Sequence, residues 1–214
     1  MNITDATYYQ LGKKFIPSIG AIQAPVQGVP TNDDKLDYFI AKYERLLLLN
    51  SLGVTLYNEL KQALLDIDNA ATKWQNLVKG IEYVKDGVTY RFDGLRGFEK
   101  DSFVAYFVFC KYMENDESYY STTGTTKAKA ENTTYFEPTR KYIDAWNIFL
   151  NGYQKTVTNS HPNYYTLDGE IVGIDYYNEP KGGIVSLEQY LEDNKADFEG
   201  YSFKRYESIN SLGI

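Results

Sequence analysis

The sequence predicts a mainly α protein: a helical bundle with an inserted β-hairpin, an extended N-terminal arm and an irregular C-terminal α+β extension. Three observations lead to this fold class. Apolar residues recur at helical spacing in several segments between residues 32 and 158. Two short alternating segments flank an Asp-Gly pair within residues 81–92. Proline and glycine punctuate both ends of the chain, which separates residues 1–31 and 159–214 from the helical part.

Residues 1–31 form the predicted N-terminal arm. Pro17, Pro25 and Pro30 stand too close together, with glycines between them, for a long helix to form. The arm carries apolar side chains that need a surface to cover, either the core of the same chain or a neighbouring protein. These side chains belong to Phe15, Ile16, Ile19, Ile22 and Val26.

The first predicted helix begins near Asn32, where short polar side chains can cap the free N–H groups. Its apolar stripe continues at 3.6-residue spacing to Leu47, and Gly53 suits a helix stop. A second helix follows, with an apolar stripe from Leu56 to Ile67. Because the link between the two helices is short, we expect an antiparallel helical hairpin.

A short helix is predicted at residues 73–80, and a β-hairpin at residues 81–92. The segments 81–85 and 88–92 alternate apolar and polar residues on either side of Asp86-Gly87. An Asp-Gly pair between two alternating segments is the strongest short-range signal for a hairpin.

A long helix is predicted from residue 95 to about residue 117. Its residues 103–113 are apolar on almost every side, and a helix of that kind is enclosed by other elements. We therefore expect this to be the central helix of the core. Cys110 is the single cysteine and lies in this apolar run, so its expected role is that of a small buried hydrophobe.

The remaining residues alternate between loops and short elements. Residues 118–134 read as a polar loop, and another helix is predicted to start at Pro138. Short strand-like pieces lie around residues 171–177, and a last helix is predicted from Ser186, where Ser-x-x-Gln matches a capping box, to about Asn194. We expect this C-terminal extension to wrap on the helical body or on a neighbour.

Composition excludes some classes of function. The net charge is −7 and the isoelectric point about 4.9, with no basic stripe for phosphate contacts, so tight nucleic-acid binding is not expected. An acidic surface maintains solubility, and it is also compatible with DNA that must slide past without sticking. No apolar run approaches the ~18 residues that a membrane-spanning helix needs. The N-terminus lacks a basic and then apolar signal pattern, so synthesis in the cytoplasm is expected.

Catalytic and metal-binding motifs are missing from the sequence. His161 is the single histidine and precedes a proline, which suggests a surface loop. No second cysteine exists for a zinc site, and no glycine-rich phosphate-binding motif occurs. We therefore expect a protein that is not an enzyme and that has no metal site and no cofactor.

Tyrosine is the compositional outlier, with 21 residues and several adjacent pairs. Tyrosine combines a large apolar face with a polar tip and is enriched at interfaces, although an AT-rich genome also raises its frequency. The candidate interface residues are Tyr8, Tyr9, Phe15, Asp86, Gly87, Gly124, Lys127, Lys129, Tyr164, Tyr165, Tyr176 and Tyr177.

Several short motifs follow one another between Leu46 and Tyr153. They are Leu52-Gly53 with Leu56-Tyr57, residues 74–80 with Tyr83, residues 92–96, residues 106–112, Thr123-Gly124 and Trp146. In this order and spacing the stretch, about half of the chain, resembles the head–tail connector (adaptor, or ring) proteins of tailed bacteriophages. The similarity is greatest to those of crAss-like phages and of related phages and prophages of gut Bacteroidetes.

This resemblance implies a compact helical bundle with an inserted hairpin, assembled as a ring, commonly of twelve subunits, in the virion neck between capsid and tail. The implied partners are copies of the same chain, the portal protein, other neck or tail proteins, and DNA that passes through the ring without specific binding. Such a ring needs two different patches on each subunit that meet head to tail. The loop at residues 118–134 could face the channel or the portal, with Lys127 and Lys129 as candidates for contacts with phosphate.

Two other functions compete with the connector ring. A carbohydrate-binding module would use the tyrosine pairs as sugar platforms, which requires aromatic side chains clustered on one exposed face. A hydrolase made only of carboxylates would need a converging pair of acidic residues, and no pair is nominated by the sequence.

Overall fold

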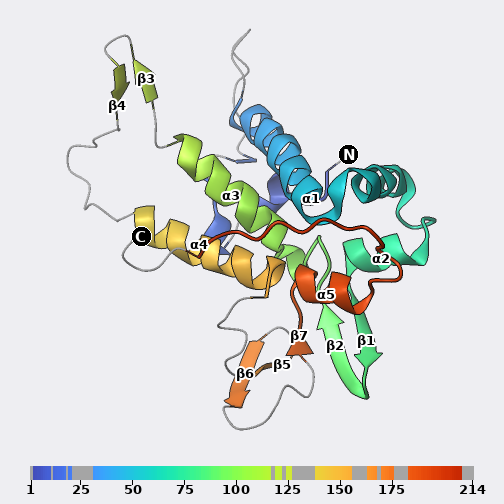
Figure 1. Cartoon of the computed structure of the whole chain (residues 1–214). Helices are drawn as coiled ribbons and strands as arrows, with labels where there is room; N and C mark the ends of the chain where they lie inside the picture. The colour runs from blue at the N-terminus through green and yellow to red at the C-terminus, as the bar shows by residue number, and fades with distance from the viewer. Residues whose placement is uncertain are drawn as a thin grey trace.

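The computed structural model describes residues 2–10, 12–17, 19–20, 31–116, 119–121, 124–126, 138–155, 163–167, 170–175 and 183–208. These residues form a mainly helical protein with a small sheet, which confirms the predicted fold class (Figure 1). The α-helices are α1 (Asn32–Ala63), α2 (Thr72–Lys79), α3 (Phe103–Asp116), α4 (Pro138–Tyr153) and α5 (Leu187–Asp193). The strands are β1 (Ile81–Lys85), β2 (Val88–Phe92), β3 (Tyr119–Ser121), β4 (Gly124–Thr126), β5 (Asn163–Leu167), β6 (Glu170–Asp175) and β7 (Gly183–Ile184). Short 3-10 helices occur at Ala6–Tyr9, Gly12–Lys14, Leu64–Asp66 and Phe98–Lys100.

Helix α3 is the centre of the core. Every residue from Phe103 to Cys110 is buried, because α3 packs against both α1 and α4. Figure 1 shows α3 lying between these two longer helices. The prediction of an enclosed central helix is therefore confirmed. Burial raises the pKa of the Cys110 thiol to about 12, so this side chain is the small buried hydrophobe that the sequence suggested.

The predicted start of this helix, at residue 95, is wrong. Gly97, Glu99 and Lys100 have φ angles of 70°, 48° and 65°, and these left-handed conformations cannot continue a right-handed helix. The helix begins instead after Ser102, whose hydroxyl accepts a hydrogen bond of 3.1 Å from the backbone N–H of Val104. A cap formed by a single serine was not visible within the longer apolar pattern.

Helix α1 consists of two helical segments that meet at Gly53, which confirms the predicted helix stop there, but the one-residue link is too short for the predicted antiparallel hairpin. Non-helical angles occur only at Gly53, with φ 75° and ψ 174°, whereas a helical hairpin needs a connecting loop of about two to five residues. The start of α1 is close to the predicted one. The Thr31 hydroxyl accepts from the N–H of Asp34, and the Asp34 carboxylate accepts from the N–H of Thr31, at 3.1 Å and 2.9 Å.

Both ends of the chain cover the helical core where they are described. In the N-terminal arm, Ile3, Tyr9 and Ile16 belong to the same apolar cluster as the helices. At the other end, residues 201–208 run as an extended segment across the helices, drawn in red in Figure 1. The described parts of the arm and the extension therefore share one core with the helices.

Hydrogen bonds fix this C-terminal segment. The indole Nε1 of Trp146 donates to the carbonyl of Glu207 at 2.9 Å, and the hydroxyl of Tyr153 donates to the carbonyl of Lys204 at 3.0 Å. The N–H of Lys204 in turn donates to the carbonyl of Asn50 at 2.7 Å. The segment thus joins α4 to α1.

The β1–β2 hairpin has the predicted position and turn. Its register pairs Ile81 with Phe92 and Lys85 with Val88. A third strand, β7, adds in parallel to β2 and was not predicted, because a two-residue strand leaves no pattern in the sequence.

Helices α4 and α5 agree more closely with their predicted positions. Helix α4 begins at the predicted residue, Pro138, and the predicted α5 is capped by the Ser186 hydroxyl, which accepts from the N–H of Gln189 at 3.3 Å.

Two of the expected regions are described only in part. Strands β3 and β4 lie within residues 118–134, which were expected to be a polar loop. Strands β5 and β6 form a hairpin that overlaps the predicted strand-like pieces around residues 171–177. His161 lies outside the described residues.

A close backbone contact clamps the base of the hairpin to the end of α2. Gly94 has a φ of 77°, and a Cβ atom there would lie 2.4 Å from the backbone nitrogen of Gly80. Beside this contact, the N–H groups of Leu95 and Arg96 donate to the carbonyls of Leu77 and Val78 at 2.9 Å and 3.1 Å. A side chain at residue 94 would push this part of the backbone away from the end of α2.

We predict that Gly94→Ala lowers the free energy of unfolding by about 3 kcal/mol, because a left-handed conformation and a backbone clash act together. Gly87→Ala is the matched control, since Gly87 has a similar φ of 78° but nothing within 4 Å of the added Cβ. The control should lose only about 1 to 2 kcal/mol. Urea unfolding of both variants measures the difference, and equal losses would contradict the clamp.

Candidate interaction surface

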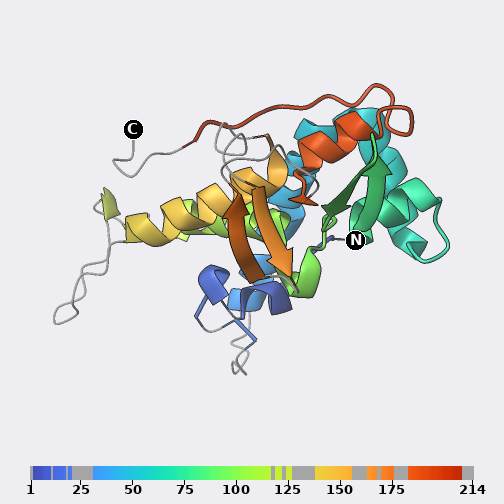
Figure 2. The same cartoon turned by 90° about the horizontal axis from the view of Figure 1, so that it is seen from below.

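The β1–β2 hairpin extends from the body beside α2 and α5 (Figures 1 and 2). Alternate residues of its strands face α5. The Phe92 ring stacks on Tyr190 with 4.4 Å between ring centroids, and the Tyr83 ring meets the edge of Tyr190 at 5.9 Å. One face of the hairpin is therefore packed, and the other face points away from the core.

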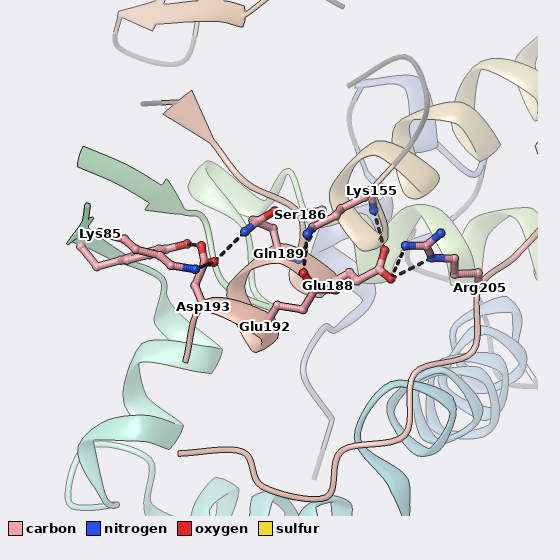
Figure 3. A network of polar contacts seen from close by, with 9 residues as sticks. Lys85, Lys155, Ser186, Glu188, Gln189, Glu192, Asp193 and Arg205 are labelled. Carbon is pink, nitrogen blue, oxygen red and sulfur yellow. Dashed lines mark hydrogen bonds and ion pairs between the residues drawn. The ribbon is translucent and has the colours of Figure 1, made fainter. Parts of the chain in front are cut away.

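The carboxylate of Asp193, at the end of α5, fastens the hairpin to the body. Its side chain is only 2% exposed and accepts from the Lys85 ammonium at 2.5 Å. It also accepts from the Tyr83 hydroxyl and from the Gln189 amide, both at 2.6 Å (Figure 3). Burial raises the pKa of the Asp193 carboxyl, but the hydrogen bonds from Lys85, Tyr83 and Gln189 outweigh it, so the pKa lies below its ordinary value. Asp193 is thus held as a buried, fully paired anion.

Two further carboxylates connect α5 to the rest of the chain. Glu188 accepts from the backbone N–H of Lys155 at 2.8 Å and from the Arg205 guanidinium at 2.7 Å. Glu192 pairs with the ammonium group of Lys155. Figure 3 shows these contacts along one side of α5, with Asp193 turned toward the hairpin. This short helix therefore fixes the hairpin, the end of α4 and the C-terminal segment relative to one another.

We define the outer sheet face as the side of β1, β2 and β7 that points away from α5. Its residues are Glu82, Val84, Thr89, Arg91 and Ile184, which the pairing of Arg91 with both Glu82 and Ile184 places on one side. Val84 is 68% exposed and Ile184 45% exposed. The Arg91 guanidinium lies 5.0 Å from the centre of the Phe98 ring, which is 46% exposed. Exposed apolar side chains around an arginine are typical of protein–protein interfaces.

The predicted interface residues occupy different environments. Asp86 and Gly87 form the exposed turn of the hairpin, with φ angles of 52° and 78°, next to the outer sheet face. Phe15 is 43% exposed, on another part of the surface. Tyr8 and Tyr9 are buried, so they belong to the core of the chain and do not form the exposed pair that the sequence suggested. The burial of Tyr9 follows from the position of the arm, which covers α1.

The other predicted interface residues are described by their backbone alone or lie outside the described residues. Gly124 lies in β4, and Tyr164 and Tyr165 lie in β5, where they pair with Ile174 and Gly173 of β6. Four more residues lie outside the described part of the chain, namely Lys127, Lys129, Tyr176 and Tyr177. Of the predicted residues whose side-chain environment is described, Asp86 and Gly87 are the ones that lie next to the outer sheet face.

A third buried carboxylate, Glu44 of α1, holds the N-terminal arm. It accepts from the N–H of Ile3 at 2.7 Å, from the N–H of Thr4 at 2.8 Å and from the Thr4 hydroxyl at 2.6 Å. Burial raises the pKa of the Glu44 carboxyl to about 7, although the hydrogen bonds from Thr4 and Ile3 oppose this rise. The arm is thus attached to α1 through a group whose charge changes near neutral pH.

A metal centre and a membrane span have no support in the described residues. No group of three or more histidine, cysteine, aspartate or glutamate side chains there is arranged to hold a metal ion. None of the helices in these ranges is both long enough and apolar enough to cross a bilayer. A small cavity of about 30 Å³ lies beside Glu44 and has room for about one water molecule.

We predict that Asp193→Ala lowers the free energy of unfolding by about 2 kcal/mol at pH 7, because the Tyr83 hydroxyl and Lys85 lose their buried acceptor. Glu192→Ala is the control, since the Glu192 side chain is 41% exposed, and its loss should stay below about 1 kcal/mol. The contribution of Asp193 is present above its ordinary pKa and is lost as the pH falls through its lower folded value. Urea unfolding at pH 7 and pH 3 should therefore show a smaller difference at pH 3, and a constant difference would rule out the buried anion.

A second prediction concerns Glu44. Because its pKa is raised from 4.5 to about 7, the stability that it contributes is full below pH 4.5 and is lost as the pH rises through about 7. The free energy of unfolding should fall by up to about 3 kcal/mol across this interval. Glu44→Gln should remove this slope, whereas Glu199→Gln, at an exposed position, should keep it. An unchanged slope in Glu44→Gln would show that another group titrates.

Comparison with known proteins gives one family match. Residues 48–142 match a family of unknown function, DUF6712. The matched residues include α2, the β1–β2 hairpin and α3, and they leave out the N-terminal arm and the C-terminal extension. No curated protein and no solved structure matches the chain.

Proposed function

We propose that this protein is a virion structural protein that forms a ring in the head–tail connector, or neck, of a tailed bacteriophage. In this role it joins the portal to the tail and encloses the channel through which DNA passes. It is made in the host cytoplasm and acts without catalysis. The observation that carries the proposal is the β1–β2 hairpin, which is fastened by Asp193 and exposes its outer sheet face.

A fastened and exposed hairpin suits assembly for a physical reason. Binding costs less free energy when the docking element is already ordered, because little conformational entropy remains to be lost. Tyr83 and Lys85 fix β1 on the body, while Val84 between them is exposed. The same strand therefore carries both the anchor and the contact surface.

Two features of the whole sequence support the same role. The similarity of the stretch from Leu46 to Tyr153 to phage connector proteins rests on residues that include the hairpin and α3. The net charge of −7 suits the wall of a channel, because a negative surface repels the DNA backbone and does not retain it. Contacts with copies of the chain and with the portal would then come from apolar surfaces such as the outer sheet face.

One of the tyrosine pairs that the carbohydrate-binding alternative requires is not on the surface. Tyr8 and Tyr9 are buried in the core, so they cannot form a sugar platform. No exposed cluster of tyrosine side chains among the described residues favours a carbohydrate site.

We predict that the purified full-length chain, mixed with the portal protein of the same phage, assembles into rings on the portal that electron microscopy detects. Val84→Asp should reduce the fraction of portals carrying a ring at least tenfold, because it places a charge in the apolar contact. Val54→Asp is the matched control, since Val54 and Val84 are both 68% exposed and Val54 lies far from the sheet in the sequence. A wild-type chain that stays separate from the portal would overturn the proposal.

A further inference from the structure

The loop that follows the hairpin holds Arg96 in a fixed position. The N–H of Arg96 donates to the carbonyl of Val78 at 3.1 Å, and the N–H of Gly97 donates to the carbonyl of Gly94 at 3.2 Å. In the part of the chain that the structure describes, no hydrogen bond or ion pair occupies the Arg96 guanidinium. A rigid backbone therefore presents five free N–H donors at one place.

Arg96 and Lys100 line an open surface hollow of about 500 Å³, together with residues of the N-terminal arm. The Lys100 ammonium donates to the Thr7 hydroxyl at 2.6 Å and lies 5.9 Å from the centre of the Tyr8 ring. This leaves two of its three N–H donors for another acceptor. The hollow thus combines a planar guanidinium with a second cation.

The carboxylates of Asp5 and Glu44 already accept hydrogen bonds, and Asp68 attracts the Arg96 guanidinium through charge alone. Asp5, which also lines the hollow, accepts from the N–H of Thr7 at 2.8 Å and from the Thr7 hydroxyl at 2.5 Å. Glu44 is buried beneath Ile3 and Thr4 and accepts from both. Arg96 and Lys100 outnumber Asp5, the one carboxylate that lines the hollow, so the hollow keeps a net positive charge and suits an incoming anionic group.

A carboxylate of another protein molecule fits the hollow better than nucleic acid does. A guanidinium binds a carboxylate through two parallel hydrogen bonds, and one carboxylate needs no more than the two cations present. Nucleic acid would need a longer positive stripe, and the chain carries a net charge of −7. The same net charge means that a second copy of the chain has acidic groups to offer.

Asp86 at the hairpin turn is the acidic group best placed to reach another molecule. It is exposed at the hairpin turn, and its neighbour Lys85 hydrogen-bonds to the buried Asp193 and attracts Asp86 through charge alone. Strands of five residues, about 17 Å long, separate Asp86 from the clamp that holds Arg96. Asp86 therefore cannot contact Arg96 of its own chain, and the contact that remains is one between two chains.

We propose that Arg96 and Lys100 of one subunit bind the Asp86 carboxylate at the hairpin turn of a second copy. This inference rests on the proposed ring, because a head-to-tail ring needs two different patches on each subunit. The hairpin turn is then one patch, and the cationic hollow is the other.

Charge reversal tests this contact in the assembly of full-length chain on the portal, measured by mass photometry. Arg96→Glu and Asp86→Lys should each reduce the assembled fraction at least tenfold, and the double variant should recover at least part of the loss. Arg140→Glu is the control, since it makes the same charge change at an exposed position of α4. Urea unfolding of each variant confirms that the fold is kept.

The outcomes separate this inference from the proposed function. If wild type assembles and Arg96→Glu assembles as well as Arg140→Glu, the inference is overturned and the ring stands. If Arg96→Glu fails while Asp86→Lys assembles normally, the hollow binds a different acceptor, and the contact with Asp86 is overturned. If wild type does not assemble, the proposed function fails and the inference fails with it.

Discussion

The enclosure of α3 is the constraint on which the rest of the structure depends. Every residue from Phe103 to Cys110 avoids water, so apolar surface must be supplied on each side of this helix. Helices α1 and α4 supply two sides, and the N-terminal arm and the segment at residues 201–208 complete the cover. Figure 2 shows the C-terminal segment and the arm on opposite sides of the helical body. Both ends of the chain are therefore structural parts of the core.

Buried carboxylates attach the non-helical parts to this core. Asp193 holds the hairpin, Glu188 holds the C-terminal segment and Glu44 holds the arm. Burying a carboxylate is costly, and each of these three groups accepts hydrogen bonds that offset the cost, although at Glu44 burial still outweighs them. Among the described residues, no buried side-chain nitrogen or oxygen lacks a hydrogen-bond partner. Polar contacts, and not apolar packing alone, thus set the orientation of the outer sheet face.

The sequence predicted the elements with local signals and missed those that depend on distant partners. The hairpin at residues 81–92 was predictable because the Asp-Gly turn and the alternation lie within one short segment. Gly53 signals an interruption of α1, but a glycine does not specify the direction of the chain that follows. Of the candidate surface, Asp86 and Gly87 were predicted, whereas the partners of Asp193 lie up to 110 residues away and leave no pattern. Tyr8 and Tyr9 were misplaced because a tyrosine pair without periodicity suits a core as well as a surface.

The extended segment at residues 201–208 has a consequence for folding during synthesis. Trp146 and Tyr153 of α4 receive their polar partners only from Glu207 and Lys204, more than fifty residues later in the chain. A nascent chain that has just released α4 from the ribosome therefore still has an open apolar groove along that helix. The native core can close only when residue 207 has left the exit tunnel, so folding follows translation of this segment and does not proceed helix by helix. Chaperones that bind exposed aromatic segments would find their target in that interval.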